Sequence, residues 1–287
     1  MDTKDLKIAM LTMEAAENRR PNTVGSSRIR GRWVMKYMPQ IVDFKAGFHY
    51  DAVIYQKAYF HEHMKQFKGV KIFDICDPDW MDGRPITEVA QLVDAFTVPT
   101  APLRDFLVQI TDKPVIIIPD RIDPEEHTPV KEEHIGKARS VVWFGYSTNQ
   151  VVLDQCLIYL QQKLLQLVVI SDRPYADADV NVKYDYATLN EEMIKHDMVI
   201  MPDYKTNLRH SFKSPNKTLT SWALKMPVAV TPEDIARFMD PEERQKEADL
   251  RYQEVMTTWH CRESGPQYID LIADILKKKA EGQRGGK

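Results

Sequence analysis

The segment SFKSPNKTLTSWALKMPVAVTPED, residues 211–234, carries a lysine where a helix is expected to begin. We expect Ser214 to cap this helix and Pro215 to take its first position, so that Asn216 and Lys217 lie in the first turn. The backbone N–H groups and the dipole of a first turn favour an anion, and a lysine there is by itself unfavourable by roughly 0.3 to 1 kcal/mol. A phosphate held by both the lysine and the helix end would explain this choice of residue; a merely solvated lysine is the alternative.

Other polar side chains also follow apolar runs of the chain. Gly145 opens the run Gly-Tyr-Ser-Thr-Asn (145–149), a candidate phosphate-binding loop, although one glycine falls short of the Gly-x-Gly-x-x-Gly pattern. The stretch DICDPDW clusters Asp74, Asp77 and Asp79. This cluster is interpreted as a substrate contact or a plain turn, with a metal site as a third reading that we do not adopt.

The composition excludes several classes of protein. The net charge of -3 and the pI near 6.3 give no overall field that attracts nucleic acid or an anionic membrane, so a polyanion site would have to be a local patch, for example near the N-terminus. The three cysteines have no zinc-binding spacing and indicate reduced thiols. No window approaches the ~18 to 20 apolar residues of a membrane span. We therefore expect a cytoplasmic protein without stable membrane insertion.

Apolar runs alternate with helical-period segments along most of the 287 residues. The predicted strands are 7–13, 51–56, 71–76, 95–100 and 114–120, then 140–146, 166–172, 197–203 and 227–232. This rhythm predicts an α/β protein with two parallel sheets, each covered by helices on both faces, joined by a polar linker over 121–138. The predicted domains are 1–130 and 131–265, followed over 266–287 by a C-terminal helix that could return to the first domain and by a polar, disordered tail.

Several motifs in order resemble one family. SPNKTLTSWALKMPVAV is similar to the donor-site segment of GT-B glycosyltransferases of the group 1, family 4-like branch, where Pro-x-Lys opens a helix. The segments that resemble other family motifs span about residues 7–232 and are DAVIYQKAY with VKIFDICDPDW, VDAFTVPTAPLRDFL, KPVIIIPDRIDPEEH, SVVWFGYSTNQVVLD and YATLNEEMIKHDMVIMPD. The resemblance implies a divergent member with two Rossmann-like, doubly wound domains facing a cleft.

The resemblance implies transfer of a hexose or pentose from a nucleotide-diphosphate sugar to a hydroxyl, without a metal or other cofactor. Lys217 would stabilise the leaving diphosphate. In an inverting reaction Asp77, Asp79 or Glu14 would accept the proton of the acceptor, whereas in a retaining reaction the donor phosphate can do so. The implied donor-binding residues are Gly145, Tyr146, Ser147, Thr148, Asn149, Ser171, Arg173, His210, Ser214, Pro215, Asn216, Lys217 and Thr220.

Three departures from the family pattern stand out. Many retaining members carry a carboxylate for the ribose where this chain has Thr220, and Lys225 replaces the glycine of a Gly-x-Pro-Val turn. The arginine that often accompanies the lysine has no counterpart after Gly145. These departures keep open a catalytically silent module that binds a nucleotide sugar or a partner, and a nucleotide-sugar epimerase or hydrolase is a further alternative.

The stretch ENRRPNTVGSSRIRGRWVMK is rich in arginine. It is interpreted either as a solvated helix face or as a contact to an anionic acceptor or the donor diphosphate. The acceptor would be a glycan, a small molecule or a hydroxylated base in DNA. The predicted acceptor or cleft residues are Ser26, Ser27, Arg28, Arg30, Gln56, Lys57 and Trp80.

Overall fold

The computed structural model describes residues 3–20, 23–202 and 208–285, and they form two compact units. Unit 1 holds the described residues of 1–121, 207–214 and 261–287. Unit 2 holds those of 122–206 and 215–260. The segment that precedes the Lys217 helix therefore belongs to unit 1, whereas the helix itself belongs to unit 2.

Unit 1 is built on a parallel six-stranded sheet with the order β2-β1-β3-β4-β5-β6. Its strands are β1 (Ile8–Thr12), β2 (Ile41–Asp43), β3 (Ala52–Gln56), β4 (Val70–Asp74), β5 (Ala95–Val98) and β6 (Val115–Ile117). Strands β1 and β3 pair in the register Ile8 to Ala52, and both are buried at every residue. Burial on two faces explains why these strands read as continuous apolar runs.

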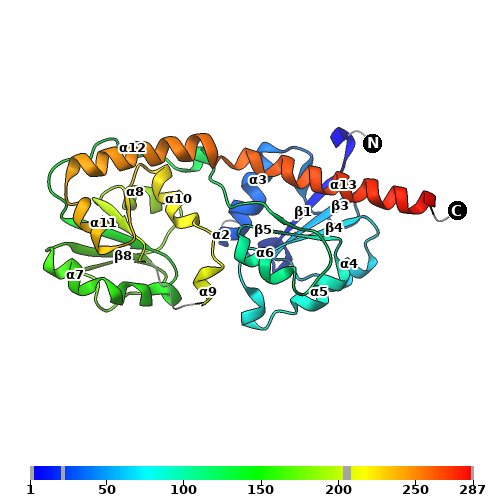
Figure 1. The fold of residues 1–287 in the computed structure, drawn as a ribbon, viewed down its shortest axis with the longest axis horizontal. Coiled ribbons are helices and arrows are strands. Elements are labelled where there is room, and N and C mark those ends of the chain that lie inside the picture. Colours follow the sequence, from blue (N-terminus) through cyan, green and yellow to red (C-terminus); the bar gives the residue numbers. More distant parts are fainter. Residues whose placement is uncertain (1–2, 21–22, 203–207, 286–287) are drawn as a thin grey trace. The chain divides into compact units, whose positions relative to one another are not determined.

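Alternate strand residues of unit 1 pack on opposite faces of the sheet. One face packs against α4 (His61–Gln66), α5 (Ile86–Leu92) and α6 (Ala101–Leu107). The other packs against α3 (Trp33–Tyr37) and α13 (Ser264–Gly285), the long red helix of Figure 1. The remaining described elements of unit 1 are α1 (Met13–Ala16), α2 (Gly25–Ser27), a π-helical turn Arg28–Arg32, 3-10 turns Thr3–Asp5, Asp79–Asp82 and Cys261–Glu263, and α9 (Leu208–Ser211).

Unit 2 repeats this plan with a parallel five-stranded sheet of order β11-β10-β7-β8-β9. Its strands are β7 (Ser140–Phe144), β8 (Gln166–Ser171), β9 (Val180–Lys183), β10 (Met198–Ile200) and β11 (Val228–Ala229). One face packs against a 3-10 run Ser147–Gln155, α7 (Leu157–Gln162) and α11 (Pro232–Arg237), and the other against α8 (Leu189–Met193) and the end of α10 (Asn216–Ala223). Helix α12 (Pro241–Thr258) lies against α10, and a 3-10 turn Pro124–Glu126 completes the unit.

The fold class predicted from the sequence is confirmed, since both sheets are parallel and covered on two faces. All nine predicted strands are present, although residue 203 of one prediction lies outside the described residues. The edge strands β2 and β9 and the helix α12 were not predicted. The predicted tail is wrong for residues 281–285, because α13 continues to Gly285.

Among the helices of the described ranges, none combines the length and the apolar character needed to cross a membrane.

Candidate functional site

In unit 2, Lys217 lies against the glycine that follows the central strand β7. A Cβ atom built on Gly145 would overlap the Lys217 Nζ and would lie 2.9 Å from the Trp143 ring. The ammonium stands over the face of Trp143, 4.8 Å from the ring centroid. Because Gly145 has no side chain, the lysine can reach the carboxyl end of β7, where parallel sheets bind their ligands.

Lys217 reaches this position from the first turn of α10, which begins at Asn216. The predicted cap is wrong: the cap residue is Pro215, which makes no side-chain capping hydrogen bond. Ser214 instead donates its hydroxyl hydrogen bond to Asp120 of unit 1. The helix start is one residue later than expected because a carboxylate competes for the serine.

The loop after Gly145 is held by a carboxylate that was absent from the predicted site. The Asp172 carboxylate accepts hydrogen bonds from the Ser147 backbone N–H at 2.6 Å and from the Ser147 hydroxyl at 3.1 Å, and Ser171 donates a third at 3.3 Å. The Ser147 N–H is the main cause that lowers the pKa of Asp172. Asp172 directly follows β8, the strand next to β7, so an acidic residue after β8 was the signal available in the sequence.

The other predicted donor residues of unit 2 lie in this loop, after β8 and on α10. Tyr146 is 59% exposed, and its carbonyl accepts the Asn149 N–H at 2.9 Å. The carbonyl of the exposed Arg173 accepts a bond from Gln150 at 2.8 Å. Thr148 lies in the same 3-10 run, and Thr220 is buried on α10 three residues after Lys217.

His210 and Ser214 stand apart from the rest, because both belong to unit 1. His210 lies in α9, beside Arg209, which pairs with Asp82 of unit 1. The structure thus groups the predicted donor residues into a set on unit 2 and two residues on unit 1.

In unit 1, Lys57 brings together the two predicted carboxylates at the ends of β3 and β4. Its Nζ lies 2.8 Å from Asp77 Oδ2 and 2.9 Å from Asp79 Oδ1, and the Tyr59 hydroxyl donates to Asp79 Oδ2 at 3.0 Å. Lys57 has a positive φ of 51°, a conformation that is uncommon for a lysine and is found at functional sites.

The two carboxylates differ in ionisation. Burial opposes the charged form of Asp77, but Lys57 outweighs it and the net effect lowers the pKa of Asp77. Burial raises the pKa of Asp79, and Lys57 offsets only part of that rise. The Asp77 side chain is 36% exposed and that of Asp79 is 7% exposed. Asp77 is therefore the more ionised and the more accessible of the two. Lys213, which was not predicted, also lowers the pKa of Asp77.

Glu14 has both carboxylate oxygens engaged. Oε1 accepts the Val24 N–H at 2.5 Å, and Oε2 pairs with Arg32. Its own N–H donates to Ser27, whose hydroxyl donates to Gln56 at 3.0 Å. The predicted residues Glu14, Ser27 and Gln56 thus form one buried cluster at the ends of β1 and β3.

Arg30 is buried and uses all five of its N–H donors. It forms two bonds with Asp74, at 2.6 and 2.7 Å. The others reach Asp120 at 2.7 Å, the Ile118 carbonyl at 2.8 Å and Tyr268 at 3.3 Å. This saturation fits a structural role that ties β4, the end of β6 and α13 together, and leaves no N–H of Arg30 for an acceptor.

The last predicted acceptor residues are Trp80 and Arg28, which lie near aromatic rings, and Ser26. Trp80 stacks on Phe106 with centroids 3.8 Å apart, and Phe212 meets Trp80 edge-on at 5.3 Å. Arg28 is buried with its guanidinium 5.9 Å from the Trp33 ring centroid, and Ser26 lies half-buried in α2.

Within the described ranges, no three His, Cys, Asp or Glu side chains are grouped so as to hold a metal ion.

No protein-family model matches the sequence. No curated protein matches it either. Among solved structures, TarM superposes with a TM-score of 0.58 and 9% identity over 77% of this chain, which spans 54% of TarM. The T4 phage BGT in complex with its UDP-glucose substrate has a TM-score of 0.56 and 14% identity, covering 94% of this chain and 99% of that one. AviGT4, a glycosyltransferase involved in avilamycin A biosynthesis, gives 0.53 and 12%, with 95% and 98% covered. The chain has the fold of the GT-B glycosyltransferases.

Proposed function

We propose that this chain is a glycosyltransferase that moves a sugar from a nucleotide-diphosphate sugar to an acceptor hydroxyl. The observation that carries the proposal is the Lys217 ammonium seated against Gly145 at the carboxyl end of β7. The fold shared with the UDP-glucose-bound T4 phage BGT supports it at the level of architecture.

The proposed role of Lys217 follows from the charge that develops on the leaving group. When the anomeric carbon separates from the diphosphate oxygen, negative charge grows on the leaving nucleoside diphosphate. Lys217 and the first turn of α10 supply a cation and backbone dipoles to that charge, the roles that a metal ion serves in other transferases. The reaction is thus proposed to need no metal or other cofactor.

Asp172 is proposed to bind the donor ribose. In Rossmann-type sheets the ribose hydroxyls are bound by an acidic residue roughly twenty residues after the glycine-rich first turn. Asp172 follows Gly145 along the chain, comes directly after the strand beside β7 and is exposed. Asp172 would bind the ribose in place of the carboxylate that many family members have at the position of Thr220.

Asp77 is proposed to accept the proton of the acceptor hydroxyl. Its side chain is 36% exposed, and its lowered pKa keeps it ionised, whereas Glu14 and Asp79 have both carboxylate oxygens engaged within unit 1. The acceptor oxygen would bond to the anomeric carbon as the diphosphate leaves, which corresponds to inversion. The acceptor is a hydroxyl of a glycan, a small molecule or a DNA base.

The test is product analysis. Wild-type protein is incubated with a panel of nucleotide sugars and with hydroxyl-bearing acceptors, and released nucleoside diphosphate and transferred sugar are quantified. We expect turnover with one donor class, loss in Lys217→Ala, and retention in Lys246→Ala, an exposed lysine of unit 2. Equal turnover in Lys217→Ala would refute the assignment of the lysine.

A second candidate is a silent module that binds a nucleotide sugar without turnover. It is favoured by one observation, the buried and neutral Thr220 at the family's carboxylate position. Donor binding that depends on Lys217 but yields no product with any acceptor would select this function.

A further inference from the structure

A groove in unit 1 lies along the edge strand β2, outside the cluster of Lys57 and the two aspartates. It has a cavity volume of about 1170 Å³ and is formed by residues before β1, by the π-helical turn and α3, by β2, and by the loop that leads to β3. The proposed transfer reaction uses none of its lining residues, although part of the arginine-rich stretch lies there.

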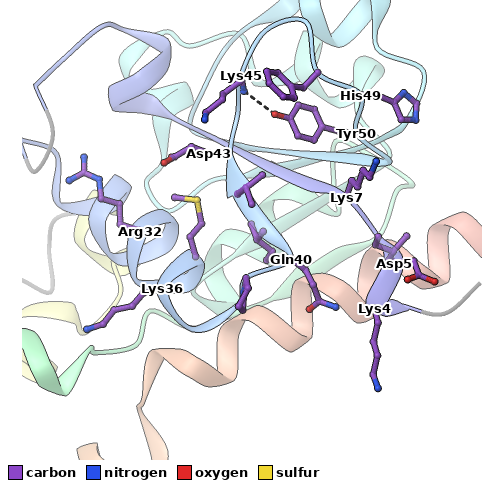
Figure 2. Close-up of a pocket in the computed structure, with 16 residues that line it drawn as sticks. Lys4, Asp5, Lys7, Arg32, Lys36, Gln40, Asp43, Lys45, His49 and Tyr50 are labelled. Atoms are coloured by element: carbon purple, nitrogen blue, oxygen red, sulfur yellow. Dashed lines mark hydrogen bonds between the residues drawn. The ribbon is translucent and has the colours of Figure 1, made fainter.

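The charge of the groove is opposite to that of the whole chain. Its lining contains five lysine and arginine residues and His49 against two aspartates, whereas the chain has a net charge of -3. Figure 2 shows the cations spread around the groove, with Arg32 and Lys36 on the helix side and Lys45 on the loop after β2. Lys7 and Lys45 are exposed. This local excess is complementary to an anion with several separated charges.

The groove also offers apolar surface between its charges. Phe48 is 68% exposed and Val42 of β2 is 44% exposed, and both line the groove beside Ile41 and Met35. An exposed phenylalanine beside lysines matches the pattern of single-stranded nucleic-acid sites, in which bases stack on aromatic rings while cations follow the phosphates. A concave groove favours a flexible strand over a flat membrane surface.

The groove and the proposed acceptor site lie along the same sheet of unit 1. Arg32, at one end of the groove, pairs with Glu14 at the carboxyl end of β1. In the sheet order β2-β1-β3-β4, the strand that precedes Asp77 lies three strands from the groove, roughly 14 Å at ~4.8 Å per strand. This span is short enough for one bound strand to occupy the groove and present a neighbouring nucleotide at Asp77.

We propose that this groove binds a single strand of nucleic acid and that the strand carries the acceptor hydroxyl. The inference rests on the proposed glycosyl transfer, because a bound strand becomes an acceptor only in that reaction. The bond from the anomeric carbon to the diphosphate oxygen breaks, a bond to the strand's hydroxyl oxygen forms, and the hydroxyl proton passes to Asp77. Lys7 and Lys45 bind phosphates and Phe48 stacks on a base.

Binding is measured by fluorescence anisotropy with a labelled oligodeoxythymidylate of about 12 nucleotides, over a range of salt concentrations. Each phosphate contact contributes ~0.7 to the slope of log K against log salt, so Lys7→Ala with Lys45→Ala should reduce the slope by about 1.4. Phe48→Ala should weaken binding at least about fivefold. The control pair Lys137→Ala with Lys246→Ala, exposed lysines of unit 2, should leave the slope unchanged.

Lys217→Ala should bind the oligonucleotide as the wild type does, which separates this test from the test of the donor site. Absence of binding at low salt, or binding that ignores both lysines and Phe48, would overturn the proposal. Vesicles of phosphatidylcholine with phosphatidylserine serve as the competing probe. Binding to these vesicles that depends on the lysines, without oligonucleotide binding, would overturn it in favour of a membrane surface.

Discussion

Replacing Gly145 with alanine is expected to weaken donor binding, because the added methyl group would occupy the space that the Lys217 ammonium fills. A Cβ at residue 145 would overlap the Lys217 Nζ and would lie 2.9 Å from the ring of Trp143. The lysine tip is flexible and moves most, and the Trp143 ring, which is 1% exposed and packed in the core of unit 2, must also give way slightly. The perturbation therefore shifts the proposed diphosphate-binding cation without removing it.

The size of the effect follows from the distance between charges. At an effective dielectric constant of about 20, an ammonium and a phosphate attract by about 5.5 kcal/mol at ~3 Å and about 4.2 kcal/mol at ~4 Å. A shift of about 1 Å thus loses about 1.4 kcal/mol, which corresponds to a roughly tenfold rise in the Kd for the nucleotide donor. Isothermal titration calorimetry with the selected nucleotide sugar measures this change directly.

The matched control is Gly136→Ala, also in unit 2. Gly136 has a positive φ of 64°, and a Cβ there meets no atom within 4 Å. Both variants add a methyl group at a backbone conformation that glycine favours, so both should lose stability by about 1 kcal/mol, and Gly145→Ala should lose more because its methyl group also meets Trp143. An unchanged Kd in Gly145→Ala, or an equal rise in Gly136→Ala, would refute the reasoning about the lysine.

Three further predictions concern the carboxylates. Asp172→Asn should raise the Kd for the nucleotide about tenfold in a titration, because it removes the charge proposed for the ribose and weakens the hold on Ser147. Asp77→Asn should lower kcat by about 10² or more while leaving the donor Kd unchanged, and a normal kcat would exclude Asp77 as the base. Lys57→Met should lower the free energy of unfolding by about 3 kcal/mol at pH 7, because it leaves buried Asp79 unpaired. The pKa of Asp79, already raised by burial, should rise further, and a native pKa above the unfolded value stabilises the fold as pH falls. Urea unfolding of this variant should show stability regained between pH 7 and pH 5; a loss over that range would contradict the pairing.

The nine strands that were predicted share a physical reason for being readable. Buried parallel strands such as β3 and β8 are apolar at nearly every residue, so the runs stand out from the amphipathic segments between them. The edge strands β2 and β9 have three and four residues and are mostly exposed, so no apolar run marks them. The long helix α12 carries only three buried residues, which leaves too weak an apolar stripe to identify it.

The sequence predicted which residues belong to the candidate site better than it predicted their hydrogen-bond and ion-pair partners. Lys217 and Gly145 follow from a helix start and a strand end, and the structure brings them together. Arg30 and Ser214 were predicted as ligand contacts, yet their partners Asp74 and Asp120 are distant in sequence. A single sequence cannot show which of several carboxylates an arginine or a serine will meet, because that pairing is decided by the packing of strands.

The central claim is that Lys217 belongs to a nucleotide-sugar site, and a thermal-shift screen tests it most directly. Wild type, Lys217→Ala and Lys246→Ala are melted in the presence of a panel of nucleotides and nucleotide sugars. A ligand at about one hundred times its Kd stabilises the native state by about 2.7 kcal/mol, which gives a measurable rise in Tm. The account predicts a rise for a selective set of donors that is lost in Lys217→Ala and kept in Lys246→Ala. No rise with any donor, or an equal rise in Lys217→Ala, would contradict it.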